Sequence, residues 1–105
     1  MMSSPVSVLL VDDSLIALTI LSRMLSSSPD IQVVGKARSG REALELIPQL
    51  QPAVICTDLH MPDMDGLELT KQIMGRFPRP ILVTRSKSPI TAPMPWRWYA
   101  SAPRR

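Results

Sequence analysis

The chain contains a single cysteine, no long apolar run, and no acidic residue from Arg79 onward. A single cysteine cannot form an internal disulfide. Because Cys56 lies inside an apolar run, we expect it to be an inert core residue. The longest apolar run is far shorter than the roughly 18 residues that a membrane span needs. No basic region followed by an apolar segment marks a signal peptide. These absences predict a cytoplasmic protein that does not enter a membrane.

The charge is divided unevenly along the chain. Residues 1–78 carry six Lys/Arg and nine Asp/Glu, whereas residues 79–105 carry six Lys/Arg and no acid. Five of the eleven prolines and both tryptophans also lie in the second part. The basic tail alone accounts for the high isoelectric point, so we expect no nucleic-acid partner on that ground.

With 105 residues, 45% of them hydrophobic, the chain is long enough for one folded core. Apolar runs predict strands over 6–11, 31–37, 54–57 and 81–84, and helical spacing predicts helices over 14–26, 39–50 and 67–77. This βαβαβαβ order indicates an α/β fold whose parallel sheet is covered on both faces. Pro48 is expected to kink or end its helix. The apolar stripe predicted to bury the first helix consists of Ala17, Ile20, Leu21 and Met24.

Three acids follow strand ends. Asp12 and Asp13 come after the first predicted strand, and Asp58 ends the third. Ligands in such sheets bind beyond the carboxyl ends of the strands. If the two strands are neighbours, the three carboxylates converge there, where Mg²⁺ would relieve their repulsion and a carboxylate could attack phosphorus. The alternative is a set of helix caps and turn acids.

Several motifs resemble the receiver domain of two-component response regulators. They are VLLVDDS (8–14), TDLHMPDMDGLEL (57–69) and PILV (80–83). The stretches 27–47 and 71–83 are most similar to the receiver of the chemotaxis protein-glutamate methylesterase, and the match covers about 6–83. The resemblance implies a flavodoxin-like, three-layer α/β/α fold with strand order 2-1-3-4.

The resemblance also implies residue roles. Asp58 matches the phosphoacceptor, Asp13 a direct Mg²⁺ ligand, Asp12 a partner that acts mostly through water, and the backbone carbonyl of His60 the third protein ligand. The implied function is that of a phosphoacceptor module in a histidine-to-aspartate phosphorelay of chemotaxis type. No enzymatic activity is expected beyond self-phosphorylation from a phosphodonor and autodephosphorylation.

The implied partner is a histidine kinase or a histidine phosphotransfer domain. In the family it docks on the first helix, beside the acidic pocket. We expect Leu15, Leu18 and Ser22 to form this surface, on the helix face opposite the buried stripe.

The chain departs from the receiver pattern after the fourth strand. Family spacing places Arg85 where a Ser or Thr should report the phosphoryl group. Thr84 is one residue early, would point to the opposite face, and is the nearest switch candidate, whereas Ser86 is one residue late. The Lys-Pro pair that ends the fifth strand of a receiver is missing, and Lys87 follows too soon to replace its lysine.

We therefore predict a truncated receiver over 1–84 and a Pro/Arg-rich, non-homologous tail over 85–105. One explanation is a lost reading frame, and the other is a specialised tail that docks a partner or the missing sheet edge. The alternative functions are a degenerate receiver that only binds proteins, or a non-functional truncated product. An open fourth strand would favour a homodimer through that strand and the tail, with Trp96, Trp98 and Tyr99 covering the exposed surface within one chain or across the dimer.

Overall fold

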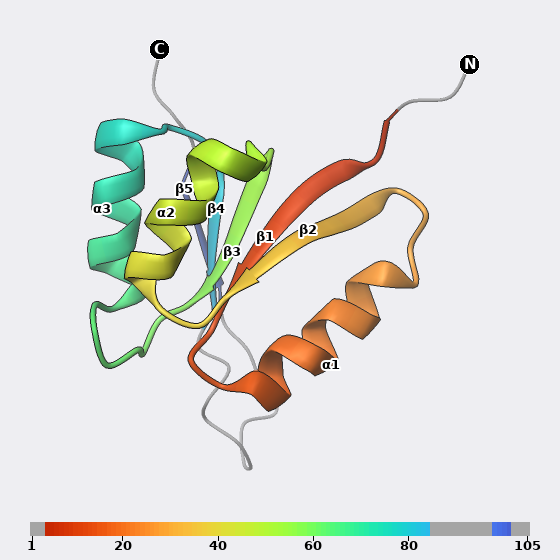
Figure 1. Ribbon diagram of the computed structural model, residues 1–105, viewed down its shortest axis with the longest axis horizontal. Coiled ribbons are helices and arrows are strands. Elements are labelled where there is room, and N and C mark those ends of the chain that lie inside the picture. The colour runs from red at the N-terminus through yellow and green to blue at the C-terminus, as the bar shows by residue number, and fades with distance from the viewer. Residues whose placement is uncertain (1–3, 85–97, 102–105) are drawn as a thin grey trace.

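A computed structural model describes residues 4–84 and 98–101 of the chain (Figure 1). All seven predicted elements are present, and an eighth follows them. In chain order the elements are β1 (Val6–Val11), α1 (Leu15–Ser26), β2 (Ile31–Ala37), α2 (Gly40–Leu50), β3 (Val54–Asp58), α3 (Gly66–Arg76), β4 (Ile81–Thr84) and β5 (Trp98–Ser101).

The strands form one sheet of order β2-β1-β3-β4-β5. The first four strands are parallel, so the predicted order 2-1-3-4 is confirmed, and β5 pairs antiparallel with β4. Helices α2 and α3 lie together on one face of the sheet, and α1 lies on the other (Figure 1). The carboxyl ends of β1 and β3 therefore meet at one edge, where the fold binds ligands.

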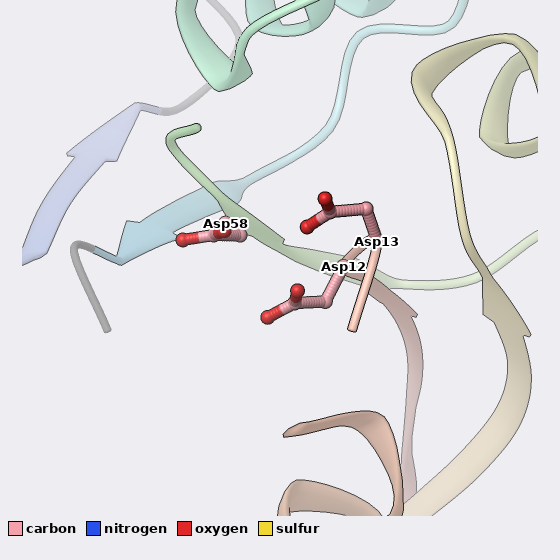
Figure 2. Close-up of side chains that lie close together, drawn as sticks. All are labelled: Asp12, Asp13 and Asp58. Atoms are coloured by element: carbon pink, nitrogen blue, oxygen red, sulfur yellow. The ribbon is translucent and has the colours of Figure 1, made fainter. Parts of the chain in front are cut away.

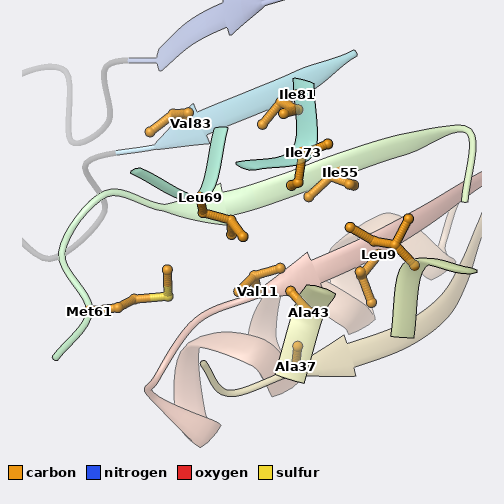
Figure 3. Packing of buried hydrophobic residues seen from close by; sticks show 11 residues of the cluster. Leu9, Val11, Ala37, Ala43, Ile55, Met61, Leu69, Ile73, Ile81 and Val83 are labelled. Atoms are coloured by element: carbon orange, nitrogen blue, oxygen red, sulfur yellow. The ribbon is translucent and has the colours of Figure 1, made fainter. Parts of the chain in front are cut away.

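Alternating side chains of the strands feed two apolar clusters, one on each face. Leu9 and Val11 of β1 join the larger cluster under α2 and α3 (Figure 3). Val8 and Leu10 join a smaller cluster, in which Leu18 of α1 is 1% exposed. Burial on both faces explains why these strands read as continuous apolar runs in the sequence.

Ser39 is the N-cap of α2. The Ser39 hydroxyl accepts a hydrogen bond from the Glu42 N–H at 3.0 Å, and the Glu42 carboxylate accepts one from the Arg38 N–H at 2.7 Å. Pro48 does not end the helix, and α2 runs to Leu50, the end that the sequence predicts. A proline so near the helix end removes only one hydrogen bond, and the helix stops at Gln51, whose φ of 50° is left-handed.

The predicted buried stripe of α1 is partly wrong. Ile20 is 52% exposed and Met24 is 64% exposed, whereas Leu18 is buried. Leu21 and Leu25 pack beside Leu18 in the smaller cluster. The helix has apolar residues on two faces and only one charged residue, Arg23, so spacing alone did not distinguish the face that packs on the sheet.

The edge of β4 is not open, and the alternative of a tail that docks on this edge within the same chain is the one that the structure shows. Residues of the predicted tail form β5, which pairs with β4 from Ile81↔Ser101 to Thr84↔Trp98. The expected dimer depended on an exposed β4, and β4 is paired with β5. The expectations for Arg85, Ser86 and Lys87 lie outside the described residues. Within the described part of the chain, no helix has both the length and the apolar character needed to cross a membrane.

Candidate functional site

The structure brings Asp12, Asp13 and Asp58 together at the carboxyl edge of the sheet (Figure 2). Each residue offers one carboxylate oxygen, and these oxygens all lie within 4.8 Å of one another. Asp12 and Asp58 are each 1% exposed, and Asp13 is partly buried. The convergence expected from the strand ends is therefore present.

The sheet register explains why these acids meet. Val11 of β1 is the partner of Thr57 of β3, so the next residues, Asp12 and Asp58, leave the two strands side by side. The Asp12 N–H donates to the Ala37 carbonyl oxygen at 3.0 Å, which ties this end of β1 to β2. Both carboxylates are thus positioned by strands whose packing is fixed by the core.

The loop that follows Asp58 turns tightly into α3. The Gly66 N–H donates to the Leu59 carbonyl oxygen at 2.7 Å. A Cβ atom at Gly66 would lie only 2.7 Å from the Asp58 carbonyl oxygen. A glycine is needed there because the backbone of α3 approaches the end of β3 so closely. Asp65 caps α3, and its carboxylate accepts a hydrogen bond from the Glu68 N–H at 2.8 Å.

The thiol of Cys56 lies two residues before Asp58, close enough for the acids of the site to affect its pKa. Burial, followed by the negative charges of Asp12 and Asp58, raises the pKa of Cys56 to about 11. The thiol therefore stays protonated at neutral pH, as expected for an inert core residue.

The donor set fits a hard divalent cation. Mg²⁺ is typically held by one or two carboxylates, with water and phosphate oxygens at the remaining positions. The cluster supplies only carboxylate oxygens, from two buried residues and one partly buried residue. Carboxylates this close together repel one another when ionised, and a bound cation relieves that repulsion.

Thr84 lies directly beside Asp58 in the sheet. The two residues are register partners at the ends of β4 and β3, and the Leu59 N–H donates to the Thr84 carbonyl oxygen at 2.8 Å. Val83 packs in the larger cluster under α3, so by alternation Thr84 points to the other face of the sheet.

The docking surface predicted on α1 needs correction. Leu15 is 57% exposed and Ser22 is half-buried, but Leu18 lies in the core and cannot contact a partner. The apolar side chains that α1 does expose are Leu15, Ile16, Ile20 and Met24.

Sequence reasoning assigned no role to Asp63, which lies in the same loop as His60. Its carboxylate accepts hydrogen bonds from the N–H groups of Gly40 and Arg41, at 3.2 and 3.0 Å. No local motif signals this contact, because its partners are more than 20 residues away in the sequence.

The parallel order 2-1-3-4, with acids at the carboxyl ends of β1 and β3, defines a flavodoxin-like α/β domain with a ligand site at that edge. The chain belongs to the response regulator receiver domain family, whose sequence model matches residues 8–92.

Two similar proteins are much longer than this chain. Protein-glutamate methylesterase/protein-glutamine glutaminase 2 of Methanospirillum hungatei is 47% identical over 78 residues, covering 74% of this chain and 22% of that protein. The corresponding protein of Methanococcus maripaludis is 46% identical over 80 residues, covering 76% of this chain and 22% of that protein. The chain thus spans about a fifth of the length of these relatives.

A solved structure supports the same assignment. The response regulator domain of Thermotoga maritima CheB matches with a TM-score of 0.75 at 37% sequence identity. The match covers 86% of this chain and 67% of that one.

Proposed function

We propose that this chain accepts a phosphoryl group on Asp58 as a receiver in a histidine-to-aspartate phosphorelay. The observation that carries the proposal is the cluster of three carboxylates, with Asp58 buried at the centre of the sheet edge. The similarity to protein-glutamate methylesterases favours a chemotaxis pathway. Receiver domains are regulatory, so we place any methylesterase activity outside this segment.

In the proposed reaction, a carboxylate oxygen of Asp58 attacks the phosphorus of a phosphohistidine. The new O–P bond forms as the P–N bond breaks, and the imidazole leaves with the electron pair of that bond. The product is an acyl phosphate on Asp58 and a histidine without its phosphoryl group. Hydrolysis of the acyl phosphate by water resets the site.

Asp13 and Asp58 would hold Mg²⁺ directly, Asp12 would act through water, and the His60 carbonyl would complete the set. When bound, the metal supplies positive charge against the phosphoryl oxygens, which is the main requirement of phosphoryl transfer. The positions of Asp12 and Asp13 after β1, and of Asp58 at the end of β3, support these proposed roles.

The proposed donor is a histidine kinase or a histidine phosphotransfer domain. The exposed leucine at the start of α1, Leu15, lies two residues after Asp13 and thus beside the site. The same exposed apolar residues of α1 support the second candidate function, a receiver that binds a partner without being phosphorylated.

Labelling with a radioactive small phosphodonor in the presence of Mg²⁺ distinguishes the two functions. We expect an acid-stable, base-labile label on the full chain, and none on Asp58→Ala. Asp30→Asn is the matched control, because Asp30 is an exposed acid at the amino end of β2 and should leave labelling unchanged. Label that persists in Asp58→Ala would rule out Asp58 as the acceptor, and an unlabelled wild-type chain would favour the binding function.

A further inference from the structure

The loop of residues 59–65, which connects β3 to α3, is anchored on a helix that belongs to a different part of the sequence. The Asp63 carboxylate bridges the N–H groups of Gly40 and Arg41 in the first turn of α2. These N–H groups have no partner within the helix, and the helix dipole favours a negative charge beside them. Burial alone would raise the pKa of Asp63, but the N–H groups of Arg41, Gly40, Met64 and Asp63 together outweigh it, and the pKa lies below its usual value.

Two neighbouring side chains strengthen the same anchor. A Cβ atom at Gly40 would come within 2.3 Å of Cγ of Met64, so the absence of a side chain lets Met64 lie against the start of α2. Met61, at the other end of this part of the loop, is 8% exposed and packs in the larger cluster. His60 therefore lies between Leu59, which is hydrogen-bonded to Thr84 and Gly66, and an anchored stretch of loop.

Helix α2 does not depend on Asp63 for its N-cap. Ser39 already caps the Glu42 N–H, and the Glu42 carboxylate reaches back to the Arg38 N–H. Arg41 and Asp63 are exposed, so water can replace the lost carboxylate at the Arg41 N–H, whereas the N–H of the buried Gly40 would lose its partner. Because the Ser39 cap remains in place, loss of Asp63 should free the loop more than it weakens the helix.

We propose that Asp63 is a positioning residue for the Mg²⁺ site, because it holds the loop on α2 and thereby fixes the backbone of His60. The inference rests on the proposed function, in which the His60 carbonyl is the third protein ligand. Partners that orient a metal ligand typically contribute about 10- to 100-fold to metal affinity. Asp63 acts through the backbone, so we expect the lower end of that range.

The test compares Asp63→Ala with Ser39→Ala in the full chain. Ser39→Ala removes the N-cap of α2 but leaves the loop anchor, so it controls for weakening of the helix itself. Mg²⁺ affinity is measured by calorimetry, and hydrogen exchange of the His60 and Met61 amides is measured without metal. We expect Asp63→Ala to weaken Mg²⁺ binding about tenfold and to speed exchange in the loop. Ser39→Ala should lower the unfolding midpoint without either effect.

Asp63→Asn keeps one acceptor oxygen and should restore part of the affinity, which also guards against a folding failure of the alanine variant. If the hydrogen exchange of the loop and the Mg²⁺ affinity of Asp63→Ala equal those of wild type, Asp63 has no positioning role. The proposed function would remain intact. If Ser39→Ala loses as much Mg²⁺ affinity and as much protection of the loop from exchange, Asp63 acts only as a helix cap. If wild type and Asp13→Ala bind Mg²⁺ with the same affinity, the proposed site and the inference both fail.

Discussion

Asp58 and Thr84 are partners across the β3–β4 pair, at the last residue of each strand. The next N–H along the chain, that of Leu59, donates to the Thr84 carbonyl oxygen at 2.8 Å. The end of β4 is thus attached both to the proposed phosphoacceptor and to the loop that follows it.

This attachment makes Thr84 the hydroxyl residue to test as a switch. Thr84→Val keeps the side-chain shape and removes the hydroxyl group. If that hydroxyl contacts the phosphoryl group on Asp58, we expect labelling to slow by roughly 2- to 10-fold, the value of one net hydrogen bond. Thr84→Ser should label like wild type. Equal initial rates in all three chains would remove Thr84 from the mechanism.

A glycine pair in α3 tests the close approach of this helix to the site. Gly66→Ala would place a Cβ atom 2.7 Å from the Asp58 carbonyl oxygen and 3.1 Å from Cα of Leu59. We expect a loss of about 1–3 kcal/mol in the free energy of unfolding, because both neighbours are backbone atoms that cannot move aside.

Gly75→Ala is the control in the same helix. Nothing lies within 4 Å of a Cβ atom there, so alanine should stabilise α3 by roughly 0.5–1 kcal/mol. Urea denaturation of both variants measures the difference. A Gly66→Ala chain as stable as Gly75→Ala would show that α3 does not press on the end of β3.

Much of this architecture could be predicted from the sequence because it depends on the order of elements. Parallel strands that follow one another through helices place their carboxyl ends on one edge, so acids after neighbouring strands lie close together. The pairing of Asp12 with Asp58 also needed the neighbourhood of the first and third strands, which only the resemblance to receivers supplied.

Features that depend on long-range contacts or on small energy differences could not be predicted. The buried face of α1 is one case, since Leu18 and Ile20 are both apolar and only packing decides between them. The contact of Asp63 with α2 is another, because nothing in the sequence around a surface acid indicates which distant helix it will contact. The strand β5 was foreseen only as one of two alternatives, a tail that docks on the missing sheet edge, because its pairing comes from the free edge of β4 and not from its own periodicity.

The raised pKa of Cys56 predicts a loss of stability at alkaline pH. The folded-state pKa is about 11 and the ordinary value is 9.0. The thiol therefore contributes its stability below pH 9, and this contribution is lost as the pH rises through 11, because the unfolded chain releases the proton first. Between pH 9 and pH 10 the loss is about 1 kcal/mol. Urea midpoints over this range should fall more for wild type than for Cys56→Ala, and parallel curves would contradict the prediction.

The corrected face of α1 predicts that two neighbouring leucines behave in opposite ways. Leu18 is 1% exposed in the smaller cluster, so Leu18→Ala should cost about 2–5 kcal/mol in the free energy of unfolding. Leu15 is 57% exposed, and Leu15→Ala should change stability by less than about 0.5 kcal/mol.

Phosphotransfer separates a docking role from a folding role for these two positions. If Leu15 contacts the phosphohistidine donor, Leu15→Ala should slow transfer from the donor protein while labelling by a small phosphodonor stays at the wild-type rate. Met24→Ala is the matched control, since Met24 is 64% exposed two turns further along the helix, away from the acids. A transfer rate in Leu15→Ala equal to those of wild type and Met24→Ala would exclude the start of α1 from the docking surface.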